Sequence, residues 1–242
     1  MSKRISFSQY TMWSNCAYAW KLRYVDGHKF DDGSIHMIFG TAMHEIIQSW
    51  LDTLYNKSET IAKTVYLHDD FKARFLELFK ENTLLTENGE KTFLADKKTL
   101  MEFYEQGCKI LTYVQNNYKK LFPTANTKLF AIEYELNAEV MNGVNYVGFI
   151  DIVTYNTATN KYVLYDLKTS RSGWTQDQKT DPNKVGQLLL YKKFFAKQMG
   201  ISEDNISVEF IILKRFVAEN TQFHIPRVIE LEAHHIQTWL LS

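Results

Sequence analysis

Two aspartates and a lysine carry the strongest chemical signal in this chain. Asp151 lies in the β-rich run 148–155, Asp166 and Lys168 lie in the run 161–170, and a polar segment of turn-forming residues separates the two runs. This pattern predicts a β-hairpin. Asp166 and Lys168 are two residues apart, so their side chains leave the same face of the strand. If the strands pair antiparallel, Asp151 comes close to Asp166.

The charges of these three residues suggest a reaction. An ionised Asp151 inside an apolar run is costly unless something compensates its charge. Two neighbouring carboxylates repel unless they share a cation, and hard oxygen ligands suit Mg²⁺ or Mn²⁺. With Lys168 beside them, they form a site for a phosphate oxygen and an activated water, which is the equipment for phosphodiester hydrolysis. The alternative is a solvated ion pair, because Asp-x-Lys at a strand end often occurs by chance.

Length, composition and charge set the outer bounds. The 242 residues, 45% of them apolar, predict a single domain over residues 1–242 with a helical insertion at about 60–122. The formal net charge is zero, from 28 basic and 28 acidic residues, so any nucleic-acid surface must be a local patch. The N-terminus lacks the apolar core of a signal peptide, and no run approaches the ~20 residues of a membrane span. We therefore expect a cytoplasmic protein with no membrane partner.

Apolar residues at helical spacing predict the helices. Residues 6–25 form a strongly aromatic helix, and such a stripe is more typical of a core than of a platform for stacked bases. A helix at 38–54 carries Gly40 and His44 at i and i+4, so the glycine leaves open space one turn before the imidazole. A lone histidine there is more often a satisfied core residue than a ligand. Two helical segments at 68–121 either shape a substrate channel or cover the core.

The second half of the chain alternates strands with one helix. A strand at 128–140 carries Glu133, and Asn142-Gly143 predicts a tight turn into the strand of Asp151. A polar stretch that is long enough for a functional loop follows the hairpin. The later elements are predicted as this loop at 171–183, a helix at 184–200 with Lys184, Gln187 and Tyr191, a strand at 205–214 and a helical tail at 229–241. The helix at 184–200 also fits an ordinary amphipathic helix with a solvated basic side.

Four short motifs follow one another along these elements: Gly40-x-x-x-His44, Gly148-x-x-Asp151, Asp166-x-Lys168 and Gln187-x-x-x-Tyr191. Each motif alone is weak. Taken together in this order, they make the chain resemble the RecB-type branch of the PD-(D/E)XK nuclease superfamily, and most closely its stand-alone exonucleases from bacteriophages. The resemblance runs from about Ser6 to Lys214. It implies an α/β fold with a restriction-endonuclease-like core, in which a helix, a three-stranded meander, a helix and a strand build a mixed central sheet.

The resemblance also implies a metal site. In this family pattern His44 is the helix-borne metal ligand, Asp151 and Asp166 are the metal carboxylates, and the carbonyl of Leu167 is a further ligand for Mg²⁺ or Mn²⁺. Lys168 then orients the nucleophilic water and stabilises the developing negative charge.

Further residues match the family pattern near the DNA. Gln187 and Tyr191 correspond to the helix face that positions the DNA strand. Glu133 matches a first-strand glutamate that is frequent in the branch, with a less defined role. Lys184, on the same helix as Gln187, is a possible secondary DNA contact.

The segment around Cys16 is similar to the N-terminal part of relatives that hold an iron-sulfur cluster with one early and three late cysteines. Here only Cys16 matches, because Cys108 precedes the core and nothing after Tyr191 is a cysteine. We therefore do not expect an iron-sulfur cluster in this chain. Either the lineage lacks it, or a cysteine-rich tail followed Ser242.

The function that follows is a Mg²⁺- or Mn²⁺-dependent deoxyribonuclease, an exonuclease rather than an endonuclease, in DNA recombination, repair or degradation. A phage-encoded protein would act in the host cytoplasm, and the sequence leaves a recombination or helicase partner open. Two alternatives stand beside this hypothesis. One is a catalytically silent DNA-binding or scaffold module of a recombination complex, and the other is a restriction-type endonuclease.

Overall fold

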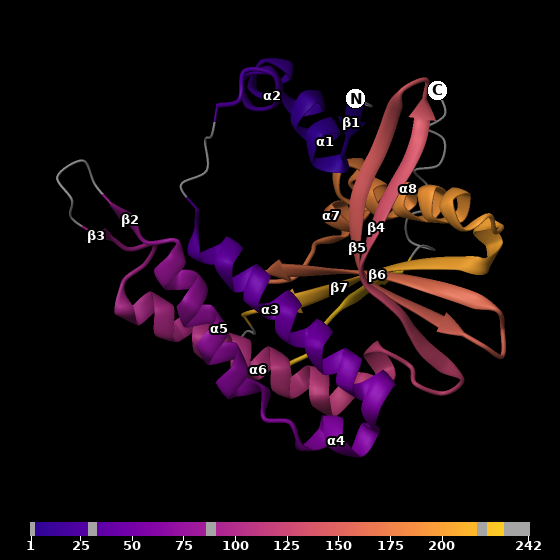
Figure 1. Cartoon of the computed structure of the whole chain (residues 1–242). Helices are drawn as coiled ribbons and strands as arrows, with labels where there is room; N and C mark the ends of the chain where they lie inside the picture. The colour runs from indigo at the N-terminus through magenta and orange to yellow at the C-terminus, as the bar shows by residue number, and fades with distance from the viewer. Residues whose placement is uncertain (1–2, 29–32, 86–90, 217–221, 230–242) are drawn as a thin grey trace.

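The computed structural model describes residues 3–28, 33–85, 91–216 and 222–229, and it forms a mixed α/β structure around one central sheet (Figure 1). The described strands of this sheet are β1 (Lys3–Ile5), β4 (Thr127–Met141), β5 (Val144–Asn156), β6 (Lys161–Ser170), β7 (Ile206–Lys214) and β8 (Arg227–Ile229). Their order is β1-β5-β6-β7-β8, with β4 paired to β5. The pairs β1–β5 and β6–β7 are parallel and the other pairs are antiparallel. The predicted mixed central sheet and its three-stranded meander β4–β5–β6 are confirmed.

The hairpin that carries the acidic residues forms as the sequence predicts. Strands β5 and β6 pair antiparallel from Ile152 opposite Tyr165 to Asn156 opposite Lys161. The turn between β4 and β5 lies at the predicted Asn142-Gly143, where Gly143 has a φ of 73°. This left-handed conformation favours glycine.

One edge of β5 is shared by two different strands. Strand β4 follows the other edge of β5 along most of its length, so β1 and β6 both pair with the remaining edge. Strand β1 takes residues 144–146 and β6 takes residues 152–156. The stretch 147–151 between them therefore has a neighbouring strand on one side only. Asp151 lies at the end of this gap.

The helices pack in two layers on opposite faces of the sheet (Figure 1). One layer contains α3 (Ile35–Asp52), which continues into a π-helical turn (Thr53–Lys57), and α4 (Glu59–Thr64), α5 (Leu67–Glu81) and α6 (Lys97–Leu121). The short hairpin of β2 (Leu84–Leu85) and β3 (Lys91–Thr92) connects α5 to α6. Phe39 of α3 makes edge contacts with Phe71, Phe75 and Phe103 in this layer. The helices of the predicted insertion thus build the core on this face of the sheet.

Helix α8 (Pro182–Met199) covers the opposite face and is preceded by the short helix α7 (Gln176–Thr180). The Asp181 side chain accepts a hydrogen bond from Asn183 N and begins α8, with proline in its first turn. Gly200 ends the helix with a φ of 66°. The predicted helix at 184–200 is confirmed, and α7 occupies part of the predicted loop at 171–183.

The N-terminal segment differs from the prediction in two respects. It forms two helices, α1 (Phe7–Asn15) and α2 (Ala17–Tyr24), instead of one helix over 6–25, because Cys16 has an extended conformation with φ −159° and ψ 101°. Neither helix contains a buried residue. Trp13 and Tyr18 are 54% and 68% exposed, so the interpretation of the aromatic stripe as core is wrong.

Two predictions concern the C-terminal end and membrane insertion. Of the predicted helical tail at 229–241, Ile229 is the last residue of β8 and the rest lies outside the described residues. No helix in the described part of the chain is both long and apolar enough to cross a membrane.

Candidate active site

The two aspartates and the lysine come together where β5 and β6 separate. Leu167 N donates a hydrogen bond of 2.6 Å to Asp151 Oδ2 across this gap. Lys168 Nζ lies 2.7 Å from Asp166 Oδ2, and Asp166 is only 1% exposed. Leu167 packs into the α3 side of the core, whereas Lys168 lies over the ring of Phe210 on the α8 side. The predicted alternation along β6 is therefore confirmed.

His44 approaches the same point from α3. Its Nδ1 atom is 3.6 Å from Asp151 Oδ2, and its side chain is 26% exposed. A Cβ built on Gly40 would lie 3.5 Å from Thr169 Oγ1 at the end of β6. The glycine thus faces the strand that carries Asp166, and the imidazole one turn later reaches Asp151.

The electrostatics of the cluster follow from burial and from the crowding of like charges. Burial and the neighbouring Asp166 charge raise the pKa of Asp151 well above its ordinary value, although the Leu167 N–H and Lys168 oppose this rise. Burial lowers the pKa of Lys168, but the Asp166 carboxylate outweighs burial and the net pKa is raised. Burial lowers the pKa of His44, which favours the neutral imidazole. A neutral imidazole is the form that binds a metal.

Gln187 and Tyr191 also lie at the cluster. Gln187 Nε2 donates a hydrogen bond of 2.7 Å to Tyr191 Oη. A Cβ built on Gly148 would lie 3.0 Å from Tyr191 Cε1, so the buried tyrosine ring occupies the space that this glycine leaves open. Burial and then the Asp166 charge raise the pKa of Tyr191, which keeps its hydroxyl protonated. Lys184 lies at the start of α8, where its ammonium is 5.4 Å from the centre of the Trp174 ring.

Three further polar residues lie near the cluster, and only one of them, Glu133, was predicted from the sequence. Glu133 of β4 accepts a hydrogen bond of 2.5 Å from Gln48, and Gln48 also contacts the backbone oxygen of Asp151. Sequence reasoning missed Gln48, although it lies four residues after His44 on the same face of α3. It also missed Tyr146, whose buried hydroxyl has no hydrogen-bond partner among the described residues. No sequence pattern marks Tyr146.

The donor set fits a hard divalent cation in its chemistry. Asp166 Oδ2 is buried and makes no hydrogen bond among the described residues, although the Lys168 ammonium lies beside it. Carboxylate oxygens with one neutral imidazole are suitable ligands for Mg²⁺ or Mn²⁺. No group of three or more His, Cys, Asp or Glu residues in the described ranges has a metal-binding arrangement. Asp166 faces Lys168, and Asp151 faces Leu167 N and His44, so the carboxylates would have to turn to share an ion.

The two cysteines lie in different parts of the fold. Cys16 is exposed, and its Sγ atom accepts a hydrogen bond from Ala19 N at the start of α2. Cys108 lies on α6 and lines a cavity of about 580 Å³ with Tyr104 and Tyr113. Cys16 therefore serves as a helix cap, far along the chain from Cys108.

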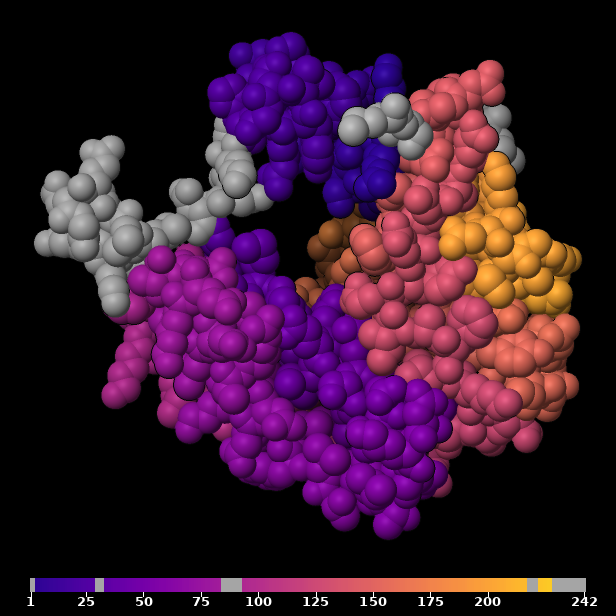
Figure 2. Space-filling view, in the orientation of Figure 1, coloured from indigo at the N-terminus to yellow at the C-terminus, as the bar shows by residue number. Residues whose placement is uncertain are grey.

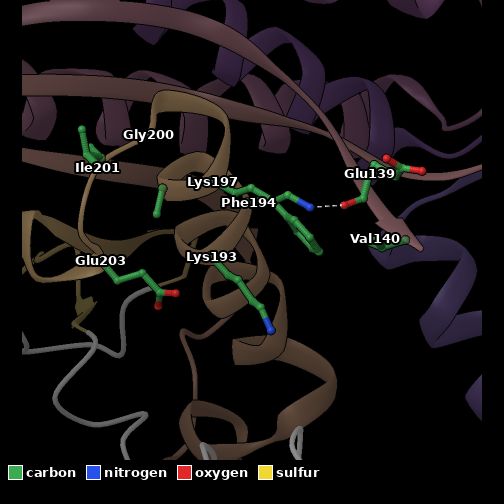
Figure 3. A pocket seen from close by; sticks show the side chains of 9 residues that line it. Glu139, Val140, Lys193, Phe194, Lys197, Gly200, Ile201 and Glu203 are labelled. Carbon is green, nitrogen blue, oxygen red and sulfur yellow. Dashed lines mark hydrogen bonds between the residues drawn. The ribbon is translucent and has the colours of Figure 1, made fainter. Parts of the chain in front are cut away.

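A hollow and a cavity lie outside the cluster. The space-filling view shows a hollow between the N-terminal helices, α3 and the β4–β5 hairpin (Figure 2). A separate cavity of about 650 Å³ lies at the C-terminal end of α8 (Figure 3). It is lined by Glu139, Val140, Lys193, Phe194, Ala196, Lys197, Gly200, Ile201 and Glu203. This lining contains no predicted site residue and balances two lysines against two glutamates.

Comparison with known families agrees with the geometry. The sequence profile of the PD-(D/E)XK nuclease superfamily matches residues 4–240. The chain belongs to the PD-(D/E)XK nuclease superfamily. Its fold is similar to the crystal structure of a "putative exonuclease" from Eubacterium rectale, with a TM-score of 0.50 and 15% identity over 99% of this chain and 79% of that chain. At this identity the similarity shows the fold alone. No curated protein matches the chain.

The sequence Asp166-Leu167-Lys168 has the acidic-x-lysine spacing in the superfamily's name, and Asp151 precedes it on the neighbouring strand. The assignment of these residues to the family's catalytic positions stays a prediction. The assignment to the RecB-type branch and to bacteriophage exonucleases stays a prediction.

Proposed function

We propose that this PD-(D/E)XK protein is a Mg²⁺- or Mn²⁺-dependent deoxyribonuclease that removes nucleotides from DNA ends. The observation that carries the proposal is the cluster at the β5–β6 gap, where two carboxylates and a lysine meet in a largely buried site. The preference for an end-directed activity over internal cleavage comes from the resemblance of the sequence motifs to those of stand-alone exonucleases. DNA recombination, repair or degradation in the cytoplasm is the setting that we propose for it.

The residues of the cluster divide the chemistry among them. His44, Asp151, Asp166 and the Leu167 carbonyl would hold the metal ion, which when bound lowers the pKa of a water molecule and neutralises phosphate charge. In the reaction the water oxygen attacks phosphorus in line, the bond to the 3′ oxygen breaks, and a 5′-phosphate and a 3′-hydroxyl remain. Lys168, held against Asp166, orients the water and stabilises the negative charge that develops on the phosphate.

Helix α8 places the DNA strand in this proposal. The hydrogen-bonded pair of Gln187 and Tyr191 lies against β5, where the Tyr191 ring packs on Gly148, three residues before Asp151. Tyr191 retains a neutral phenol, which donates hydrogen bonds well to phosphate oxygens. Lys184 adds positive charge one turn before Gln187.

The test is digestion of end-labelled linear DNA and of a closed circle, with Mg²⁺, with Mn²⁺ and with chelator. We expect metal-dependent loss of nucleotides from the linear substrate only. Asp166→Ala and Lys168→Ala should abolish this activity, whereas Lys161→Ala, at the exposed opposite end of β6, should retain it. Undiminished cleavage by both site variants would refute the proposal. Cleavage of the circle would indicate an endonuclease, and DNA binding without cleavage at any metal concentration would indicate a scaffold.

A further inference from the structure

Gln48 is a buried polar side chain that joins α3 to two strands. It is 6% exposed, and its amide nitrogen donates 2.5 Å to Glu133 Oε1 and 3.2 Å to the backbone oxygen of Asp151. An amide NH₂ group has two donors, and both are used here. Burial of such a group is costly unless it is hydrogen-bonded. The two hydrogen bonds therefore fix the position of Glu133 relative to α3 and β5.

Glu133 has a backbone conformation that requires such support. Its φ is 48°, in the left-handed region, which costs a non-glycine residue about 1–3 kcal/mol. It lies between the bridges of Ile132 to Ile152 and Tyr134 to Ile150, at the position opposite Asp151. Strain of this kind persists only where the surrounding structure determines the conformation.

The strain coincides with a change in which residues of β4 and β5 face the core. On β4, Ala131 and Tyr134 both pack on the α8 side of the sheet, although they are three residues apart. On β5, Ile150 and Val153 do the same. Strict alternation would place residues three apart on opposite faces. The alternation of side-chain facing therefore breaks in both strands around the pair of Glu133 and Asp151, while the pairing of β4 with β5 keeps its register there.

This break in alternation places the Glu133 carboxylate on the α3 side of the sheet, at Gln48. The same Gln48 nitrogen binds Glu133 Oε1 and the backbone oxygen of Asp151, so the carboxylate lies close to the backbone of Asp151. The cluster thus contains three carboxylates, those of Glu133, Asp151 and Asp166, and one ammonium, that of Lys168. A divalent cation matches the remaining charge.

We propose that Gln48 is a positioning residue, which holds the strained Glu133 carboxylate beside the backbone of Asp151 so that Glu133 completes the acidic site for a divalent cation. The inference rests on the proposed function of the site. Gln48 touches neither the DNA nor the ion. It acts through Glu133 and through the backbone of Asp151.

The experiment measures the dissociation constant of Mn²⁺ for the full chain without DNA, by calorimetry. Gln48→Met removes both donors at similar size, and Gln48→Asn shortens the reach to Glu133 should the first variant fail to fold. We expect either change to weaken Mn²⁺ binding by roughly 10- to 100-fold, the usual effect of losing a partner that orients metal ligands. Gln198→Met is the matched control, because Gln198 also ties a helix to β4, by hydrogen bonds to Tyr134 Oη and the Glu135 oxygen, on the α8 side.

A double-mutant cycle separates positioning from a general structural effect. In a Glu133→Gln background, Gln48→Met should weaken Mn²⁺ binding little further, because its partner carboxylate is already lost. Equal losses in both backgrounds, or unchanged binding by folded Gln48→Met, would overturn the inference. If the unmodified protein neither binds Mn²⁺ nor cleaves DNA, the proposed function itself fails. If the unmodified protein binds Mn²⁺ and cleaves DNA, and Gln48→Met binds Mn²⁺ equally well, only the positioning role of Gln48 fails.

Discussion

The ion pair of Lys168 and Asp166 permits a prediction in which stability and activity respond differently. Asp166 is almost fully buried, and the ammonium of Lys168 lies 2.7 Å from its Oδ2 atom. Lys168→Met removes this ammonium but keeps an unbranched side chain that can lie over the Phe210 ring. Asp166→Asn with Lys168→Met removes both charges at little change in volume.

The magnitudes follow from the burial of the two partners. Loss of one partner from a fully buried ion pair costs about 3–5 kcal/mol. The Lys168 side chain is 35% exposed, so water screens part of the interaction, and we expect a loss of about 1–3 kcal/mol in Lys168→Met. The double variant has no buried unpaired charge, so it should recover most of this loss. Catalysis should fall by at least about 100-fold in both, because both lack the charge that stabilises the transition state.

The assay combines thermal unfolding in chelator with initial rates of DNA digestion at saturating Mg²⁺. For a protein of this length each kcal/mol shifts the melting temperature by about 2–4 °C. We expect Lys168→Met to melt lower than the double variant, and both to be inactive. Equal melting temperatures for Lys168→Met and the unmodified protein would refute the buried ion pair. Retained cleavage by either variant would refute the catalytic role of Lys168.

Three further predictions concern Asp151, the aromatic helices and Gly148. Because the pKa of Asp151 is raised in the folded metal-free protein, its contribution to stability is full below its ordinary pKa of about 4 and is lost as the pH rises through the raised value. In chelator, Asp151→Asn should therefore lose less stability than the unmodified protein as the pH rises from 5 to 8. Parallel plots of melting temperature against pH for the two proteins would contradict this. Trp13→Ala should weaken single-stranded DNA binding by about 1–3 kcal/mol with little change in melting temperature, whereas Tyr66→Ala, at another exposed aromatic, should leave binding unchanged. Gly148→Ala places a Cβ 3.0 Å from Tyr191 Cε1 and should cost about 1–3 kcal/mol of stability and weaken DNA binding, which melting and titration would show.

Local sequence signals predicted the framework of the site well. The hairpin of β5 and β6 followed from β-rich runs and turn residues, and the face shared by Asp166 and Lys168 followed from the two-residue period of a strand. The helix end at Gly200 also followed from capping chemistry, whereas the helix begins after Asp181, slightly earlier than the predicted start at Lys184. These features depend on residues close together in the sequence, so one chain is sufficient to predict them.

Features that depend on tertiary contacts were not predictable in the same way. The helical spacing continues through Cys16 without glycine or proline, and nothing local marks the break between α1 and α2. Periodicity shows that Trp13 and its neighbours share a face, but it does not show whether another element covers that face. The left-handed backbone of Glu133 was likewise not predictable, because the sequence of the strand at 128–140 shows an ordinary alternation. The single-domain organisation over residues 1–242 stays a prediction.

Two irregularities of the sheet explain how residues from opposite layers meet. Because β1 and β6 share one edge of β5, the sheet has a gap beside Asp151, and Leu167 N bonds to the carboxylate there instead of to a strand backbone. Because the alternation of side-chain facing in β4 and β5 breaks around Glu133, a second acidic group reaches the α3 side, where Gln48 binds it. His44 then approaches through one face while Tyr191 closes the other.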